Sequence, residues 1–465
     1  MLDSLPLRAR RDALARAWAE AHDGPVVVAA GLPVPIAGTD QFHDFHAHAE
    51  HVYLAGTAIP GAALAFDRAD GWTLFVPVAS QDERVWVGGG ESIEAAAAAS
   101  GVERVLPSSR LGGWFEARRG EPIALLGNRD ITHHAEGYGI ENWAALEVEI
   151  DGYASHQLSV ILSDARRAKD ESELALMRGA AHATLAGHLA ALRLSRPGMT
   201  ERQLQVEVEA EFFRAGAART AYGSIVGGGP NAAVLHFSPT SRPFADGELV
   251  LMDAAAEWGG YAADVTRSWP VSGRFEGIQR DLYELVLEVQ RNAIAGVRPG
   301  KEYRELHMEA ALGIAAGLVD LGLLRGAPQD LVERDAHAIF FCHGLGHMLG
   351  LATHDAGGCL AGRPPSDRFG LKWLRADLPL EANYVVTVEP GIYFIEAILG
   401  DPAVREKYQT EVNWERVDAL KGFGGIRVED DVRVTADGAE VLTSAIPKQI
   451  DEIEELRREG LAAHA

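Results

Sequence analysis

The sequence predicts a two-domain protein in which helices and strands alternate. Its 465 residues exceed what one hydrophobic core usually fills, so two domains are expected. Short apolar runs typical of strands alternate with helical segments up to about residue 160, which indicates an α/β domain. A strongly charged segment at residues 163–173 then interrupts this pattern. We therefore place the boundary there, with domains over residues 1–164 and 165–465.

The first domain opens with a charged, amphipathic helix and continues with short strands. Four closely spaced histidines, His43, His46, His48 and His51, could bind a metal. Their spacing fits no helical face and no set of carboxylates accompanies them, so a surface or interface role is favoured. The expected elements are helices over residues 7–21 and 92–100 and strands over 25–30, 63–66, 72–77 and 123–127.

The second domain begins with two long helices, which end near Leu194 and Ala215. Pro197 and Gly198 mark the end of the first helix, and Thr200 is the expected N-cap of the second. The rest of the domain again mixes both kinds of element. Strands are expected over residues 249–254, 262–269, 384–388 and 425–435, and helices over 279–296 and 303–321.

Composition excludes several classes of function. The formal net charge of −24 argues against nucleic-acid binding, which needs clustered Lys and Arg. No apolar stretch approaches the ~20 residues that cross a bilayer, and the N-terminus lacks the apolar region of a secretory signal. The two cysteines, Cys342 and Cys359, are too few for a disulfide framework. We therefore expect a cytoplasmic protein that binds neither nucleic acid nor membrane, with Cys342 as a small buried residue.

A hairpin carries the first chemical signal. Two β-type runs flank the turn at residues 257–260, and pairing of Glu257 with Gly260 would place Asp253 opposite Asp264. Their Cβ atoms would then lie ~5 Å apart on one face of the sheet. Two carboxylates this close repel each other unless a proton or a cation lies between them. A shared divalent cation is the favoured interpretation, and two turn-forming aspartates are the alternative.

A glycine-rich segment carries the histidines. His343 and His347 have the spacing of a helical zinc pair, but three glycines at residues 344, 346 and 350 disfavour a helix. The glutamate of an H-E-x-x-H motif is also missing, which excludes that kind of zinc site. Glycines among histidines, with His354 close behind, suggest that the backbone approaches a functional site closely.

Two glutamates complete the set. Glu389 follows a Val-rich strand and precedes a Pro-Gly turn. Arg427 and Glu429 are expected on one face of another strand because side chains alternate along it. A carboxylate buried there needs a partner, which a metal and Arg427 would supply.

These residues resemble the pita-bread metallopeptidases, which include methionine aminopeptidase, aminopeptidase P and prolidase. The resemblance covers roughly residues 165–445 and implies an α+β pita-bread catalytic domain behind an α/β domain like those of creatinase and prolidase. One departure is Ala255, where the family often has glycine. The metal ligands implied by the resemblance are Asp253, Asp264, His347, Glu389 and Glu429.

The resemblance also implies roles for the surrounding residues. His236, His343 and His354 would contact the substrate or the tetrahedral intermediate. Arg427 would orient the acidic ligands, and so would Tyr222 and Thr266. Glu389 would accept or relay the proton of the attacking hydroxide.

Charge balance suggests the cofactor. Four carboxylates neutralise two divalent cations, and oxygen-rich ligation with one imidazole and no thiolate suits Mn²⁺, with Co²⁺ or Zn²⁺ as substitutes. Two such ions can activate a bridging hydroxide and polarise the scissile carbonyl.

The branch of the family sets the expected substrate. The segment at residues 370–380 and the insertion at 394–423 resemble those of prolidases. Arg375 would then bind the carboxylate of a dipeptide, since pairing of guanidinium with carboxylate is bidentate. We expect an Xaa-Pro dipeptidase, with aminopeptidase P acting on longer peptides as the alternative.

Two other readings remain. A pita-bread binding module without catalysis and a metal-free creatinase are both disfavoured by the full set of ligands. The resemblance further implies a homodimer, short proline-containing peptides as substrates and a possible side activity on organophosphates.

Overall fold

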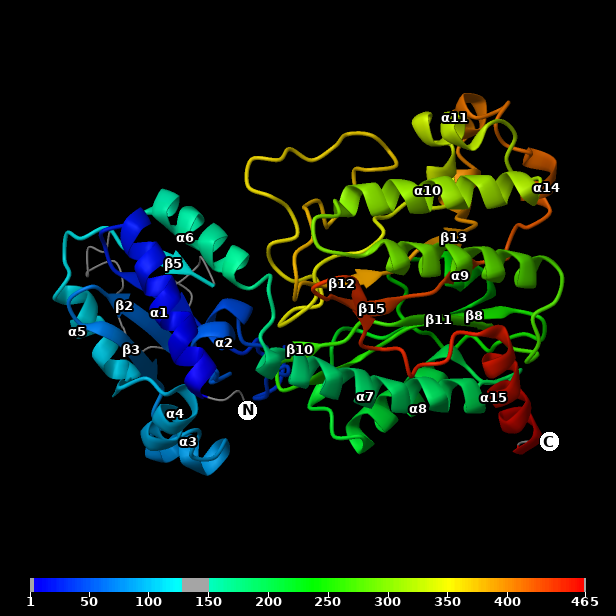
Figure 1. Cartoon of the computed structure of the whole chain (residues 1–465). Helices are drawn as coiled ribbons and strands as arrows, with labels where there is room; N and C mark the ends of the chain where they lie inside the picture. The colour runs from blue at the N-terminus through cyan, green and yellow to red at the C-terminus, as the bar shows by residue number, and fades with distance from the viewer. Residues whose placement is uncertain (1–3, 128–149, 464–465) are drawn as a thin grey trace. The chain divides into compact units, whose positions relative to one another are not determined.

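The computed structural model describes residues 4–127 and 150–463. The chain forms two compact units, Met1–Arg166 and Arg167–Ala465 (Figure 1). The expected fold classes, α/β for the first unit and α+β for the second, are confirmed.

The N-terminal unit is built on a five-stranded sheet with the order β4-β3-β2-β1-β5. β1 pairs antiparallel with β2 and parallel with β5, while β3 pairs antiparallel with β2 and parallel with β4. This mixed sheet needs helical crossovers, as the alternating sequence pattern predicts. The strands are β1 (Val26–Ala29), β2 (Ala63–Asp67), β3 (Gly71–Val76), β4 (Arg104–Pro107) and β5 (Ala124–Leu126).

Helices bury apolar residues against this sheet. Val27, Phe75, Phe115 and Leu125 form part of its core. Trp18 is buried and donates its indole N–H to the carbonyl of Leu158 at 3.3 Å, which joins the first and last helices of the unit. These helices are α1 (Ser4–Ala21), α2 (Ala49–Ala55), α3 (Gln81–Trp86), α4 (Ile93–Ser100), α5 (Leu111–Glu116), α6 (Gly152–Ala165) and the short η1 (Ser108–Arg110).

The C-terminal unit contains four small sheets, all of antiparallel strands. Their orders are β10-β9-β6, β11-β8-β7, β12-β15-β16 and β13-β14. The strands are β6 (Arg219–Thr220), β7 (Ile225–Gly228), β8 (Leu249–Asp253), β9 (Ala256–Trp258), β10 (Tyr261–Ala262), β11 (Thr266–Pro270), β12 (Val385–Val388), β13 (Gly391–Tyr393), β14 (Gly425–Arg427), β15 (Asp430–Val434) and β16 (Ala439–Val441).

Two helix pairs enclose these strands. α7 and α8 lie on one side and α9 and α10 on the other (Figure 1). The expected N-cap Thr200 is confirmed, since its hydroxyl accepts from the amide of Gln203. The helices are α7 (Glu171–Leu194), α8 (Glu201–Arg214), α9 (Ile278–Gly296), α10 (Tyr303–Asp320), α11 (Pro328–Glu333), α12 (Glu396–Leu399), α13 (Pro402–Lys407), α14 (Trp414–Asp418), α15 (Ile450–Ala463) and the short η5 (Gly229–Ala233) and η6 (His337–Ile339).

The structure corrects three details of the predicted strands. The strand expected over residues 262–269 is two strands, β10 and β11, which belong to different sheets and are separated by residues 263–265. The single strand expected over residues 425–435 is two strands, β14 and β15, which belong to different sheets and are separated by Val428 and Glu429. The hairpin forms, but Gly259 and Gly260 make its turn, and Tyr261 pairs with Trp258. Asp253 therefore lies opposite Thr266 and not opposite Asp264.

The difference between the predicted and the observed register of the hairpin is explained by the conformation of its turn. Gly259 and Gly260 both adopt positive φ angles, 59° and 89°, as a two-residue hairpin turn of this kind requires. A shift of two residues keeps the same side chains on the same face of the sheet. Asp253 and Asp264 are therefore diagonal neighbours on one face.

Among residues 4–127 and 150–463, no helix combines the length and the apolar character needed to cross a membrane.

Candidate metal centre and its cavity

The five expected metal ligands line one cavity of about 570 Å³ in the C-terminal unit. Four of them lie at the end of a strand or between two strands, and the fifth, His347, lies in an irregular segment. Asp253 ends β8, Asp264 lies between β10 and β11, and Glu389 follows β12. Glu429 occupies the break between β14 and β15, and His347 lies in the glycine-rich segment, which forms no helix, as expected.

Three of these residues converge most closely. One ligand atom from each of Asp264, His347 and Glu429 lies within 4.8 Å of the others. His347 Nε2 is 3.3 Å from Asp264 Oδ2 and 3.6 Å from Glu389 Oε1, so Glu389 adjoins the group. Asp253 is turned partly away, towards Arg427 and Tyr222.

The electrostatics of this cluster fit a cation. Burial, together with the neighbouring carboxylates, raises the pKa of Glu429 well above its ordinary value. Burial also raises the pKa of Asp253 and of Glu389, although Arg427 opposes the shift in Asp253. Four carboxylates in such a place are costly unless positive charge is supplied. Their oxygens, with one imidazole, are the donors that divalent ions accept.

Arg427 links the outer carboxylates to the cluster. Its guanidinium donates to Asp253 Oδ2 at 2.6 Å, to Thr266 Oγ1 at 2.8 Å and to Tyr393 Oη at 2.7 Å. Thr266 in turn donates its hydroxyl to Glu429 Oε2 at 2.6 Å, and Tyr222 donates to Asp253 Oδ1 at 2.5 Å. The structure thus brings Arg427, Thr266 and Tyr222 against the acidic residues.

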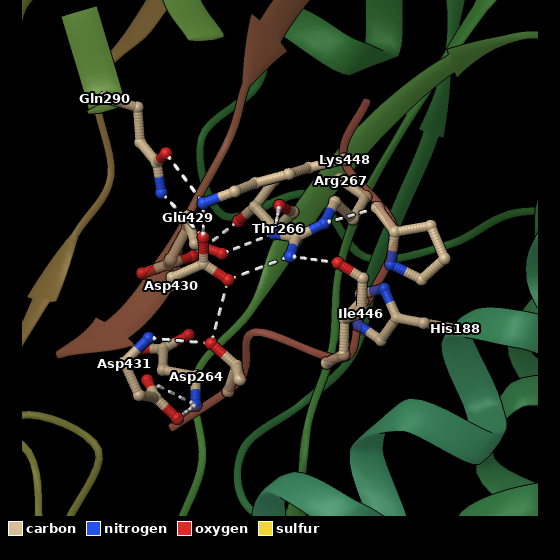
Figure 2. Close-up of polar contacts among 12 residues, drawn as sticks. His188, Asp264, Thr266, Arg267, Gln290, Glu429, Asp430, Asp431, Ile446 and Lys448 are labelled. Carbon is tan, nitrogen blue, oxygen red and sulfur yellow. Dashed lines mark hydrogen bonds and ion pairs between the residues drawn. The ribbon is translucent and has the colours of Figure 1, made fainter. Parts of the chain in front are cut away.

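A second layer of buried charge, which no sequence pattern predicted, lies behind the cluster. Figure 2 shows Asp430 between Arg267 and Lys448. Arg267 Nη2 is 2.8 Å from Asp430 Oδ1, and both side chains are 0% exposed. Lys448 donates to Asp430 Oδ2 at 2.5 Å, and Arg267 also donates to the backbone carbonyl of Glu429 at 2.5 Å.

Asp431 extends this layer to the other side. The amide of Asp264 donates to its carboxylate at 3.2 Å, as Figure 2 shows. The backbone of two expected ligands, Asp264 and Glu429, is therefore held by Asp431 and Arg267. Only the adjacent acidic pair Asp430-Asp431 after Glu429 could have drawn attention to this layer in the sequence.

His343 is held in one tautomer by its neighbours. Tyr393 accepts a hydrogen bond from Arg427, so its own hydroxyl is free to donate to His343 Nε2 at 2.9 Å. His343 Nδ1 then carries the proton and donates to the carbonyl of Gly344 at 2.8 Å. Burial and the charge of Arg427 lower the pKa of His343 to about 3. Tyr393 was missed in the sequence because nothing there pairs it with His343.

The two remaining histidines are exposed on the cavity wall. His236 and His354 both line it, and they also line a second pocket that reaches Asp253 and Asp264. Partial desolvation of the ring in the cavity, together with the nearby His347, lowers the pKa of His354 to about 4, so its ring is neutral at pH 7. The guanidinium of Arg375 lies against this ring, 2.8 Å from Nε2. The structure therefore places Arg375 on the cavity, next to His354.

The predictions for Cys342 and for the N-terminal histidines have different outcomes. Cys342 is a free, buried cysteine, as expected, although it also lines the cavity. The surface role favoured for the N-terminal histidines is wrong for His51, which is 0% exposed and contacts the carbonyl of Val28 through Nδ1. Within the described ranges, no possible metal-binding group includes any of these histidines.

Comparison with known proteins agrees with this geometry. Residues 175–436 match the model of metallopeptidase family M24, and residues 7–119 match that of the aminopeptidase P N-terminal domain. The Xaa-Pro aminopeptidase of Escherichia coli (strain K12) is 32% identical over 96% of both chains. A probable Xaa-Pro aminopeptidase, pepP, of Aspergillus niger is 34% identical over 90% of both. The structure of Pseudomonas aeruginosa aminopeptidase PepP superposes with a TM-score of 0.80, 31% identity and 99% coverage of both chains.

Proposed function

Because this chain belongs to metallopeptidase family M24, we propose that it is an Xaa-Pro aminopeptidase, which removes the first residue of a peptide whose second residue is proline. The observation that carries the proposal is the buried group of acidic residues with His347, in a chain whose full-length relatives bear that name.

This proposal reverses the order of the two substrate predictions. The sequence analysis favoured Xaa-Pro dipeptides because of the segment that contains Arg375. Two relatives that match 90% or more of both chains, from E. coli and Aspergillus niger, are named Xaa-Pro aminopeptidases, which favours the alternative of longer peptides. Cleavage of dipeptides stays as a second candidate because Arg375 lines the cavity and could bind a nearby carboxylate.

Five residues would hold the metal ions. These are Asp253, Asp264, His347, Glu389 and Glu429, and their oxygen-rich donor set favours Mn²⁺ over a structural Zn²⁺. Bound metals would supply an acidified water and a polarised carbonyl. The ion's identity and a homodimeric state remain predictions.

The other groups would act on the substrate. Glu389, whose Oε1 lies 3.6 Å from His347 Nε2, is placed to take a proton from the attacking water and pass it to the leaving nitrogen. The neutral ring of His354 can donate an N–H to the oxygen of the tetrahedral intermediate. His343, fixed by Tyr393, and His236 both line the cavity and would position the peptide.

The residues around the ligands would keep them in place. Arg427 compensates the charge of Asp253 and orients Thr266, which holds the carboxylate of Glu429. Mutation of such residues around metal ligands commonly lowers metal affinity or activity by roughly 10- to 100-fold.

A peptide panel tests this function. The purified protein, loaded with Mn²⁺, is assayed by chromatography on Ala-Pro-Ala, Ala-Ala-Ala and Ala-Pro. We expect release of alanine from Ala-Pro-Ala, little from Ala-Ala-Ala and slower cleavage of Ala-Pro. Faster cleavage of Ala-Pro than of Ala-Pro-Ala would favour the dipeptidase instead. Equal cleavage of Ala-Ala-Ala would contradict any preference for proline.

A further inference from the structure

The first turns of α10 lie beneath two segments that line the cavity. Tyr303 and His307 are four residues apart, so they share one face of this helix. Both are 0% exposed. Tyr303 donates its hydroxyl to the carbonyl of Thr387 at 2.6 Å, next to the strand end that carries Glu389. His307 contacts two other segments, one on each side of its ring.

The hydrogen bonds of His307 determine its tautomer. The amide of Leu345 donates to His307 Nδ1 at 3.2 Å, so that nitrogen carries no proton. Nε2 must then be protonated in the neutral ring, and it donates to the carbonyl of Gly370 at 2.8 Å. Burial lowers the pKa of His307 to about 4, which keeps the ring neutral at pH 7. One imidazole thus bridges two backbone segments.

The two segments that His307 bridges contribute different residues to the cavity. The inner one, residues 343–347, carries His343 and the expected metal ligand His347. The outer one, which we call the rim segment, is residues 369–375, and Phe369, Lys372, Trp373 and Arg375 from it line the cavity wall. Lys372, Trp373 and Arg375 are exposed, and the rim segment contains no helix or strand.

Close packing fixes the relative position of these two segments. A Cβ atom added to Gly344 would lie 3.1 Å from the carbonyl oxygen of Trp373 and 3.2 Å from Leu374 Cα. A Cβ added to Gly370 would lie 2.8 Å from Asp335 Oδ1. At Gly344 the backbones of the two segments therefore pack closely, whereas Gly370 packs against the side chain of Asp335. At the start of the rim segment, Arg368 donates to Asp335 Oδ1 at 2.8 Å.

From this geometry we propose that His307 is a positioning residue, which holds the rim segment on the metal-site segment so that peptide residues beyond the cleaved bond are bound correctly. The inference rests on the proposed peptidase function. His307 touches neither substrate nor metal ligand. Its loss should weaken peptide binding and leave the bond-breaking step and the metal site largely intact.

The test begins with His307→Phe in the full-length, Mn²⁺-loaded protein. Phenylalanine keeps a ring against Phe341, whose centroid lies 5.4 Å from that of His307, but it removes both hydrogen bonds. We expect KM for Ala-Pro-Ala to rise about tenfold, as for the loss of one or two buried hydrogen bonds. We expect kcat and bound metal to stay within about twofold, and amide hydrogen exchange of the rim segment to accelerate.

Two partial replacements separate the bonds. His307→Gln keeps a donor that can reach the carbonyl of Gly370, whereas His307→Asn keeps an acceptor near the amide of Leu345. We expect glutamine to restore most of the wild-type KM and slow exchange in the rim segment, and asparagine to restore neither. If His307→Phe does not fold, this pair still tests the proposal.

Tyr303→Phe is the matched control, because it removes one buried hydrogen bond from the same face of α10. We expect its KM and the exchange of the rim segment to stay near wild-type values. A similar fall of kcat and of metal content, with the same rise of KM, in all three His307 variants would indicate general loss of structure and overturn the proposal. Unchanged KM and exchange in His307→Phe would overturn it too. If the wild-type protein cleaves no peptide, the proposed function fails, and hydrogen exchange still decides whether His307 holds the rim segment.

Discussion

At the residue scale, Arg375 is the side chain that bears most directly on substrate length. Arg375 lines the cavity wall, where its guanidinium contacts His354 and could bind a carboxylate of the substrate. A dipeptide would present its C-terminal carboxylate close to the scissile bond, and a tripeptide would present it one residue farther away. Arg375 can therefore favour one length over the other.

Replacing Arg375 with alanine should separate the two substrates. We expect kcat/KM for Ala-Pro to fall by about 10- to 100-fold, the effect of losing a charge-assisted hydrogen bond, with Ala-Pro-Ala changed by less than about threefold. Steady-state kinetics measure both values. Lys407→Ala, which removes an exposed cation that does not line the cavity, serves as the control and should leave both rates near wild type. Equal losses on both peptides would mean that Arg375 acts through His354 and not on the carboxylate.

Single residues also show how far the sequence could predict the site. Asp253, Asp264, His347, Glu389 and Glu429 stand out because each is a polar residue at a strand end or among glycines. Residues that act through distant partners give no such signal. Tyr393 meets His343, which is 50 positions away, and Lys448 joins the group through contacts made only after folding.

At the scale of elements, the predicted hairpin shows a different limit. The long helices α1, α7, α8, α9 and α10 follow from hydrophobic period and capping residues, whereas most of the short helices and several short strands were not predicted. The register of the hairpin depends on which residues form the turn, and the sequence Glu-Trp-Gly-Gly allows two choices. The positive φ angles of Gly259 and Gly260 select the shorter turn. Residues 425–435 read as one strand because the break at Glu429 keeps the extended pattern of apolar and polar residues.

The buried contacts of Asp430 tie the C-terminal residues 443–448 to the strands that carry Glu429 and Thr266. Arg267 donates to the carbonyl of Ile446 at 2.9 Å (Figure 2). It also donates to the carbonyl of Pro447 at 2.9 Å, and Thr443 donates to Asp430 at 2.8 Å. Arg267 and Lys448 both compensate the charge of Asp430, and they lower its pKa to about 2 despite its burial. Asp430 is thus the acceptor that unites the C-terminal segment with the core.

Removal of this acceptor should be costly. Asp430→Ala leaves Arg267 buried without its carboxylate, and we expect the free energy of unfolding to fall by about 3–5 kcal/mol. Asp418→Ala is the control, since it breaks an ion pair with Arg405 at 2.7 Å whose side chains are 34% and 55% exposed. That change should cost about 1 kcal/mol or less. Urea denaturation of the metal-free proteins measures both, and similar losses would contradict the role given to Asp430.

At the scale of the whole molecule, buried neutral histidines make stability depend on pH. Burial lowers the pKa of each of them from the ordinary 6.5 to about 3 or 4. Between pH 6.5 and about 4, these histidines are therefore protonated in the unfolded chain but stay neutral in the folded chain. Their stabilising effect is fully present above pH 6.5 and is lost as the pH falls towards the folded-state pKa. These residues are His51, His188, His307, His337 and His343.

His188 provides a test of this acid sensitivity. It is 1% exposed, and its Nε2 contacts the carbonyl of Ala254 at 2.9 Å. We expect the unfolding free energy of the wild-type protein to fall between pH 6 and pH 4, with His188 contributing about 1.4 kcal/mol per pH unit. His188→Gln should reduce that slope by the same amount, measured by urea denaturation at several pH values. An unchanged slope would show that His188 is protonated in the folded state.

The central claim is that the acidic cluster around His347 holds metal ions that the peptidase needs. The most direct measurement is cleavage of Ala-Pro-Ala, together with bound metal, after chelation and after reloading with Mn²⁺, Co²⁺ or Zn²⁺. We expect the metal-free protein to be inactive and Mn²⁺ to restore activity. Asp264→Ala should stay inactive and bind less metal, while Asp246→Ala, at an exposed position, should behave as wild type. Full turnover by the metal-depleted Asp264→Ala protein would contradict the account.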